Sequence, residues 1–358
     1  MRTNIFDKLS FLSLFLVIVL LPIFFLPFTS IPVETSKGLL LVVGLAVCII
    51  CWGLARFFDG KISLPRSAIL FAGGGVVLAF LLSAIFSKGS QVSFFGTMFD
   101  IGAFWFVFSG FLLMLMSSII LKDAKKAKIV LFGAILSSVL VLIFQSVHLF
   151  FPAVSSLGIL IDKTSNVVGS WNAFGIFAGF SALLSLLVIE FFSTTRFEKI
   201  ILQILTILSL LLVATVNFSF VWGLLGIFAL IIFVYKFSIT AKENNQSELK
   251  KRIPLFSLAV MLICLLFFVG AFSVRLAYVL HIDRPFGEIL PNYFGIQDNE
   301  VNPSFTATMG VTQSVLKARP LFGIGPNKFG DAWAMYKHLS INTTPIWDVS
   351  FGSGSGFL

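Results

Sequence analysis

The segment from Leu316 to Gly330, LKARPLFGIGPNKFG, combines residue types that can bind an anion. It places two glycines and two prolines within seven residues and adds three cations. These cations are Lys317, Arg319 and Lys328. Cationic side chains and the free N–H groups at the start of a following helix can contact the same anion. A simpler interpretation is that Gly323 and Gly325 only bend the chain between two surface helices, with Pro326 in the first turn of the second.

The three histidines are the candidates for a general base, because imidazole titrates near neutral pH. They are His148, His281 and His338. Two of them also have a structural interpretation. His148 could pair with Gln145 on the same helix face, and His281 could be a surface residue beside Asp283. His338 follows the glycine segment directly.

The cysteines do not indicate redox or metal chemistry. Cys48 and Cys51 form a C-x-x-C pair, but both lie in an apolar run, as does Cys264. Such a run offers no polar support for a thiolate, so we expect small hydrophobic packing residues and no metal site.

Composition places these residues in a membrane protein. Hydrophobic residues make up 58% and charged residues 11%, with a mean hydropathy of +1.03. Soluble domains have about 45–50% apolar and about 25% charged residues. The net charge of +9 comes from short clusters between the apolar runs, which are typical of topology signals and not of nucleic-acid binding.

Apolar runs long enough to cross a bilayer predict an all-α polytopic membrane protein with about nine spans. The predicted spans are 9–28, 38–55, 67–86, 101–121, 129–150, 171–192, 200–216, 218–235 and 254–274. We expect Pro22 and Pro27 to kink the first span. The hairpin 200–235 turns within a residue or two of Asn217, so a re-entrant pair is an alternative for it.

The Lys and Arg residues predict the orientation. Sixteen of them fall on the side of the N-terminus, either before the first span or in the loops between spans. The short loops of the other side hold only Lys37, Lys88 and Lys163. The positive-inside rule then predicts a cytoplasmic N-terminus for the membrane domain 1–274 and an extracytoplasmic loop 275–351.

The loop 275–351 is far longer and more polar than the others, which is typical of a functional segment. We expect short helices at 304–318 and 328–338. Residues 352–358 are small and apolar, so we expect them to begin a further span of a longer protein.

The order of these features resembles the O-antigen ligase and polymerase superfamily of bacterial envelope-glycan enzymes. The family has a motif (H/R)-P-L-F-G-x-G-x-x-x-F in its large periplasmic loop. The matching residues are Arg319, Pro320, Leu321, Phe322, Gly323, Gly325 and Phe329. The stretch VVGSWNAFGIFAGF, residues 167–180, also resembles the family's G-(T/S)-x-x-N-x-x-(G/A) motif, with matches at Gly169, Ser170 and Asn172.

The resemblance implies a GT-C-like, metal-independent glycosyltransferase without a cofactor, in the bacterial cytoplasmic membrane. It would move a glycan from an undecaprenyl-pyrophosphate carrier to a lipid, protein or glycan acceptor. A diphosphate leaving group needs fixed cations, best supplied by arginine. The outer-side candidates are Arg275, Arg284 and Arg319, with Lys317, Lys328 and the turn at Gly323 and Gly325. His338 and His281 are the candidate bases.

Two family features are missing. The S-R-(G/A) arginine has no counterpart in VNFSFVWGLLG, residues 216–226, and the His-Asn pair has none in INTTPIWDVSFGSGSG, residues 341–356. Another arginine could take the phosphate role, the residue could lie beyond Leu358, or the chain could be a divergent member without this activity. Asn217 and Asp348 could take the places of the missing arginine and the missing His-Asn pair. A lipid-linked saccharide transporter or flippase, with Glu190 as its ionisable residue, and a non-catalytic scaffold or sensor are the alternative functions.

Overall fold

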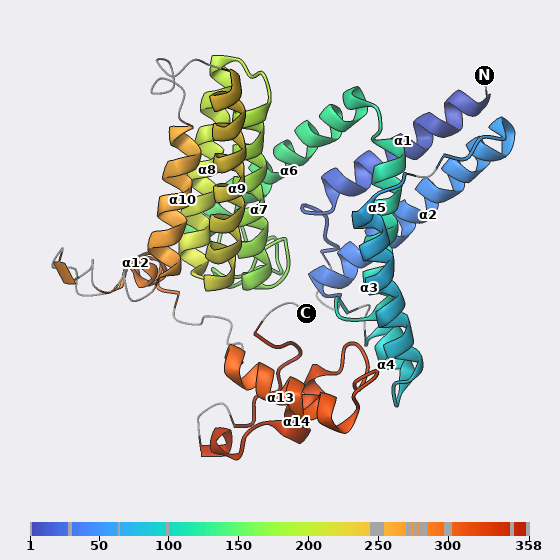
Figure 1. Ribbon diagram of the computed structural model, residues 1–358. Coiled ribbons are helices and arrows are strands. Elements are labelled where there is room, and N and C mark those ends of the chain that lie inside the picture. The colour runs from blue at the N-terminus through green and yellow to red at the C-terminus, as the bar shows by residue number, and fades with distance from the viewer. Residues whose placement is uncertain are drawn as a thin grey trace. The chain divides into compact units, whose positions relative to one another are not determined.

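The computed structural model consists of helices joined by loops and turns in the part of the chain that it describes (Figure 1). It describes residues 2–27, 31–63, 65–97, 100–243, 254–269, 274, 278–279, 285–296, 303–343 and 347–355. The helices are α1 (Arg2–Leu20), α2 (Val33–Asp59), α3 (Ala68–Ile85), α4 (Ser90–Phe95), α5 (Phe104–Ile120), α6 (Ala124–Phe150), α7 (Trp171–Phe191), α8 (Arg196–Val216), α9 (Ser219–Glu243), α10 (Leu255–Phe268), α12 (Phe286–Tyr293), α13 (Phe305–Ala318), α14 (Phe329–Tyr336) and the 3-10 helix η2 (Leu339–Thr343).

The chain divides into two compact units. The first comprises Met1–Leu26, Ser30–Gly133 and Val301–Leu358, and the second comprises Pro27–Thr29 and Ala134–Glu300. Helix α6 begins in the first unit and ends in the second. Each unit is therefore described by itself below.

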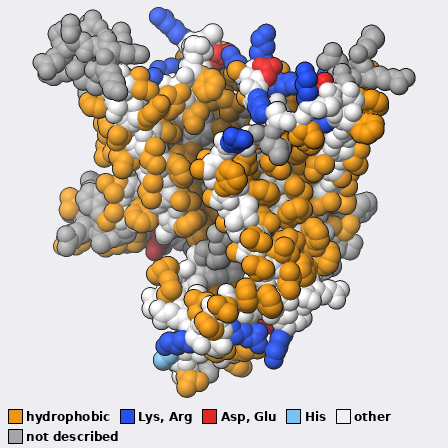
Figure 2. All heavy atoms as spheres, turned by 45° about the vertical axis from the view of Figure 1, so that its right-hand side comes forward, with side chains coloured by type: hydrophobic (Ala, Val, Ile, Leu, Met, Phe, Trp, Pro, Cys, Tyr) orange, Lys and Arg blue, Asp and Glu red, His pale blue; other side chains and the backbone are white. Residues whose placement is uncertain are grey.

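The long helices identify a polytopic membrane protein. Among the described residues, six helices are long and apolar enough to cross a bilayer: α2, α3, α6, α7, α8 and α9. Helices α5 and α10 are apolar but shorter. On α3, Ile69 and Phe71 are 71% and 76% exposed, as a lipid environment favours. On the face drawn in Figure 2, hydrophobic side chains cover most of the helical surface, while Lys and Arg gather near helix ends.

Each of the nine predicted spans overlaps one of the helices α1, α2, α3 and α5–α10. The first span differs from its prediction in detail. Helix α1 ends at Leu20 and is not kinked at Pro22, because the residue before a proline avoids helical geometry and the proline has no N–H to continue the helix. The number of crossings stays a prediction.

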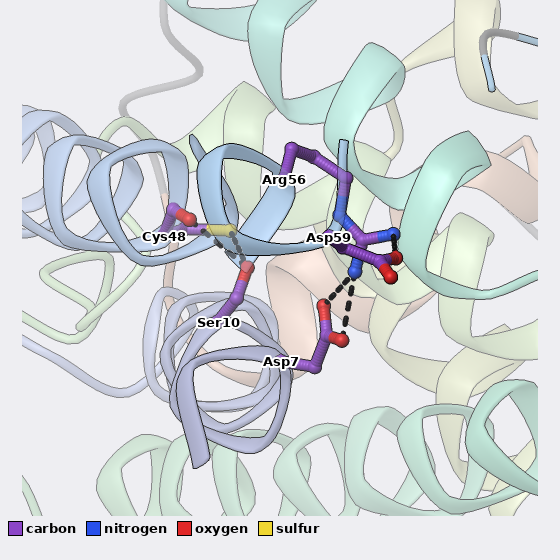
Figure 3. A network of polar contacts seen from close by, with 5 residues as sticks. All are labelled: Asp7, Ser10, Cys48, Arg56 and Asp59. Atoms are coloured by element: carbon purple, nitrogen blue, oxygen red, sulfur yellow. Dashed lines mark hydrogen bonds and ion pairs between the residues drawn. The ribbon is translucent and has the colours of Figure 1, made fainter. Parts of the chain in front are cut away.

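In the first unit, α1 and α2 form a hairpin with polar contacts near one end (Figure 3). Arg56 Nη2 on α2 lies 2.6 Å from Asp7 Oδ1 on α1, and Arg56 Nη1 lies 3.2 Å from Asp59 Oδ2. Ser10 Oγ donates to the Cys48 carbonyl oxygen at 2.9 Å. Cys48 is buried and forms no disulfide, and its Sγ lies 3.5 Å from Ser10 Oγ, so it packs between the two helices. The described residues also form no cluster of potential metal ligands.

Helices α3 and α5 also form an antiparallel pair in this unit. Near the start of α3 and the end of α5, Lys122 Nζ donates to Ser63 Oγ at 3.1 Å. Beyond the other end of α3, the short helix α4 leads back to α5, and the rings of Phe94 and Phe104 meet edge to face at 5.5 Å. The two ends of α3 therefore present different surroundings, with Arg66 at one end and Lys88 at the other.

The part of the first unit after Val301 has its own small core. Val311 and Val315 of α13 pack with Ala332 and Trp333 of α14 and with Phe351. The two helices correspond to the predictions at 304–318 and 328–338, with α14 ending two residues earlier. The core holds both helices against the connecting loop, whose Ile324 packs on the same cluster.

In the second unit, α7, α8, α9 and α10 pack side by side. Asn217 ends α8 in the left-handed conformation (φ 54°), which allows the abrupt turn into α9. Both helices are long enough to span a bilayer, so the alternative of a re-entrant pair is not needed. Gly175 and Gly179 on α7 face Val216 of α8 and Val221 of α9, at distances that leave little room for a side chain.

Candidate functional site

The segment from Leu316 to Gly330 packs against the end of α3 and the loop that follows this helix. Ser83 Oγ donates to the Phe322 carbonyl oxygen at 2.7 Å, and Ser87 Oγ donates to the Ile324 carbonyl oxygen at 2.9 Å. The rings of Phe86 and Phe322 stack with their centroids 4.3 Å apart. Ser83 and Ser87 are four residues apart and lie on the same side of the chain as it leaves α3. They therefore bind two alternate carbonyl groups of the glycine segment. We call residues 319–328 in this position the docked loop.

Gly325 is required by the close approach of this loop to the chain after α3. Its φ is 110°, and a Cβ atom there would lie 2.3 Å from Ser87 Oγ and 2.6 Å from Ser93 Oγ. Gly323 also has a positive φ, 62°, but its surroundings are open. The first glycine therefore serves the turn, while the second serves the turn and the contact.

Asn327 ties the loop to the start of α5. Its Nδ2 donates to Asp100 Oδ2 at 2.8 Å, and the same carboxylate oxygen accepts the backbone N–H of Thr97 at 3.0 Å. Asn327 has a φ of 58°, a conformation that asparagine tolerates better than most residues. The N-cap of α14 is Lys328, so Pro326 lies before the helix and not in its first turn, contrary to the simpler interpretation.

Lys328 does not present its charge to solvent. The residue is 9% exposed, and its Nζ donates to the carbonyl oxygen of Lys88. An ammonium in this position fastens the loop to the segment between α3 and α4. In the structure this ammonium has a protein partner, and the role of Lys328 as a substrate contact stays a prediction.

Arg319 has the opposite surroundings. It is the C-cap of α13, is partly exposed, and its guanidinium makes no ion pair or hydrogen bond with the described residues. Its carbonyl oxygen accepts the Gly323 N–H at 3.2 Å, so the turn itself fixes the backbone beside it. Lys317, one turn earlier at the end of α13, is exposed. Arg319 is the motif cation that remains available for a ligand.

His338 is exposed and lies at the start of η2. Its Nδ1 accepts the Ser340 N–H at 3.2 Å and lies 2.7 Å from Ser340 Oγ. A nitrogen that accepts an N–H carries no proton, so the neutral ring keeps its proton on Nε2. In this tautomer the ring caps a turn, and Nε2 can donate a proton but not accept one. A catalytic role for His338 stays a prediction.

His148 is fully buried near the end of α6 in the second unit. Its Nε2 lies 2.9 Å from the Asp162 carbonyl oxygen, and its Nδ1 lies 2.8 Å from Ser155 Oγ. Both ring nitrogens therefore fix the loop that follows α6. The expected partner, Gln145, instead donates from Nε2 to the Lys163 carbonyl oxygen at 3.1 Å.

The second motif forms the start of α7. Ser170 is the N-cap, and its side chain accepts the Ala173 N–H at 3.2 Å. Asn166, just before it, accepts the N–H groups of Val168 and Gly169 through Oδ1. This motif therefore has a structural role as a helix cap. The remaining predicted site residues, Arg275, His281 and Arg284, lie outside the described residues.

Comparisons with protein-family models, with curated proteins and with solved structures gave no match for this chain. The residues that could act on a ligand are therefore identified by geometry alone.

Sequence reasoning missed the partners of the docked loop. Ser83, Ser87 and Asp100 precede it by more than two hundred residues, and each binds one of its groups. The spacing of the serines was the available signal, since residues four apart at the end of a helix lie on the same side of the chain. Nothing in the sequence indicates which carbonyls they would bind.

Proposed function

We propose that this protein is an envelope-glycan ligase or polymerase that transfers a glycan from an undecaprenyl-pyrophosphate carrier to a lipid, protein or glycan acceptor on the outer face of the bacterial cytoplasmic membrane. The observation that carries this proposal is the docked loop. It contains Arg319, whose guanidinium has no partner in the described part of the chain, and it packs at the end of the apolar, span-length helix α3. A lipid diphosphate presents its charge at that level of a bilayer, just beyond the hydrocarbon.

Arginine suits this leaving group. Transfer breaks the bond between the anomeric carbon and the phosphate oxygen, and an acceptor hydroxyl forms the new bond and releases its proton. Negative charge grows on the diphosphate as the bond breaks, and the planar guanidinium can bind two of its oxygens at once. A cation whose position is fixed before the reaction stabilises that charge without reorganisation.

The contacts along α3 support the predicted sidedness. Lys122 meets Ser63 near the Arg66 end of α3, whereas Lys328 meets Lys88 beyond the opposite end. The positive-inside count assigns the first group to the cytoplasm and Lys88 to the outside. The docked loop lies at the same end of α3 as Lys88, where an extracytoplasmic loop is expected.

The transporter alternative gains no support from the described spans. Glu190 was its ionisable residue, and it lies one residue before the end of α7. Its Oε1 accepts the Ser257 Oγ–H at 2.6 Å, and its carbonyl oxygen accepts Lys236 Nζ, so these contacts join α7 to α10 and α9. These contacts give Glu190 a structural role, because they hold the ends of the helices together.

The test is transfer by the purified protein, given an undecaprenyl-pyrophosphate glycan and a panel of acceptors. We expect Arg319→Ala to lower the transfer rate roughly tenfold to a hundredfold, because a fixed charge on the leaving group is lost. Arg319→Lys should recover part of the rate, since a lysine restores charge but not the fork. Lys125→Ala is the control and should retain the rate, because Lys125 is an exposed cation in the first turn of α6, on the predicted cytoplasmic side.

Lys328→Ala separates folding from chemistry. We expect it to lower the free energy of unfolding by about 1–3 kcal/mol, because a hydrogen bond from a charged group is lost, whereas Arg319→Ala should not. Equal transfer by Arg319→Ala and the parent protein would remove Arg319 from the site. Movement of the lipid glycan between leaflets without glycosylation of any acceptor would replace the enzyme by a flippase.

A further inference from the structure

A pocket lies beside α14, apart from the docked loop. It has a volume of about 500 Å³, within the range of small-molecule sites, roughly 300–1,000 Å³. Its wall includes the two tryptophans Trp333 and Trp347, with Lys337, Asp348 and Ser350. All of these residues belong to the part of the first unit that follows Val301.

The two indoles have different roles in this pocket. Trp333 belongs to the small core at 2% exposure, with the Phe351 ring 5.0 Å away edge to face. Its Nε1 is buried and has no hydrogen-bond partner among the described residues. Trp347 is 56% exposed, and its carbonyl oxygen accepts Lys337 Nζ, which ties the segment of Trp347 to the end of α14. One indole is therefore a fixed wall and the other an accessible flat surface.

The residues that line the pocket indicate which kind of ligand it can bind. Lys337 and Asp348 contribute opposite charges, so the pocket does not favour a ligand of either sign. The indoles offer flat apolar surface, while the Asp348 carboxylate and the Ser350 hydroxyl offer hydrogen bonds. A ligand that matches both must carry an apolar face and several hydroxyls, and a neutral pyranose ring has both.

We propose that this pocket binds a neutral hexopyranose of the glycan, with one sugar face on the Trp347 indole and sugar hydroxyls on Asp348 and Ser350. The assignment of that sugar to a glycan substrate rests on the proposed function, whereas binding of the sugar itself does not. The pocket would position the glycan chain, and Arg319 would contact the diphosphate.

The experiment is saturation-transfer NMR on the full chain in detergent. The probes are methyl glycosides of glucose, galactose and mannose, with choline chloride and inorganic phosphate as charged probes. We expect signal transfer to the ring C–H protons of at least one hexoside. Trp347→Ala should weaken its binding about threefold to tenfold, through the lost ring contact. Trp347→Phe should retain most of it.

The control is Leu339→Ala, which removes an exposed side chain that does not line the pocket. Absence of signal from every hexoside, or an unchanged signal in Trp347→Ala, overturns the proposal. Preferential binding of choline overturns it too, since the pocket would then be a cation site. Hexoside binding without any transfer would leave the pocket intact and refute the glycosyltransferase. Transfer without hexoside binding would support the glycosyltransferase and refute the sugar pocket.

Discussion

At the scale of single residues, two cations of one motif have different surroundings. The ammonium of Lys328 is bound to the Lys88 carbonyl, whereas the guanidinium of Arg319 has no partner among the described residues. Both were candidates for the same phosphate. The lysine takes part in the loop's attachment, whereas the binding of a ligand by the arginine is a proposal.

Gly325 provides a sharp residue-scale prediction. Gly325→Ala puts a Cβ atom 2.6 Å from the Ser87 Cβ, so rotation of the serine hydroxyl cannot relieve the clash. Together with the positive φ, we expect a loss of about 1–3 kcal/mol in the free energy of unfolding and faster proteolysis of the docked loop. Thermal melts and limited trypsin digestion in detergent measure the two effects.

Gly310→Ala is the matched control, because Gly310 lies in α13 with open space around it. It should leave stability unchanged or raise it slightly, since alanine favours a helix over glycine. Equal melting temperatures for the two variants would contradict the close approach at Ser87.

At the scale of elements, the helices α7, α8 and α9 meet through small residues. The Cβ that Gly179 lacks would lie 2.6 Å from Val221 Cγ1, and the one that Gly175 lacks would lie 2.8 Å from Val216 Cγ1. Lipid gives packed helices no hydrophobic driving force, so close backbone approach supplies the attraction through van der Waals contact.

Gly179→Leu tests this packing. The new side chain must push α9 away from α7, so we expect the protein to lose about 1–3 kcal/mol of stability or more. The measurement is unfolding in mixed micelles, followed by tryptophan fluorescence. Gly110→Leu is the control, because Gly110 is exposed on α5 with nothing near its missing Cβ. A similar loss in both variants would contradict the close packing at Gly179, because leucine favours a helix over glycine and the control site has open space.

At the scale of the whole molecule, the sidedness of the chain can be tested directly. In a variant with its three cysteines replaced by alanine, Leu321→Cys lies on the docked loop and Lys125→Cys lies in the first turn of α6. Both native residues are exposed. We expect a membrane-impermeant maleimide to label Leu321→Cys in intact bacterial spheroplasts and Lys125→Cys only after permeabilisation. Labelling of both before permeabilisation, or the reverse pattern, would contradict the predicted orientation.

The sequence by itself determined the membrane class, the helical architecture and the approximate ranges of the long helices. These follow from local patterns, since an apolar run of span length must satisfy its backbone hydrogen bonds internally as a helix. The short helices α13 and α14 also followed from local signals. The end of α1 at Leu20 did not, because we expected Pro22 to kink the helix and not to end it.

Only the tertiary structure decided what the motif residues do. The docked loop depends on contacts between residues more than two hundred positions apart, such as Ser83 with Phe322 and Asp100 with Asn327. The same is true of the aromatic pocket, whose walls come from α14 and from the segment around Trp347. Composition and spacing show which residues are cationic or flexible. Which of them keeps a free charge depends on the partners that folding brings close, and no local pattern encodes those partners.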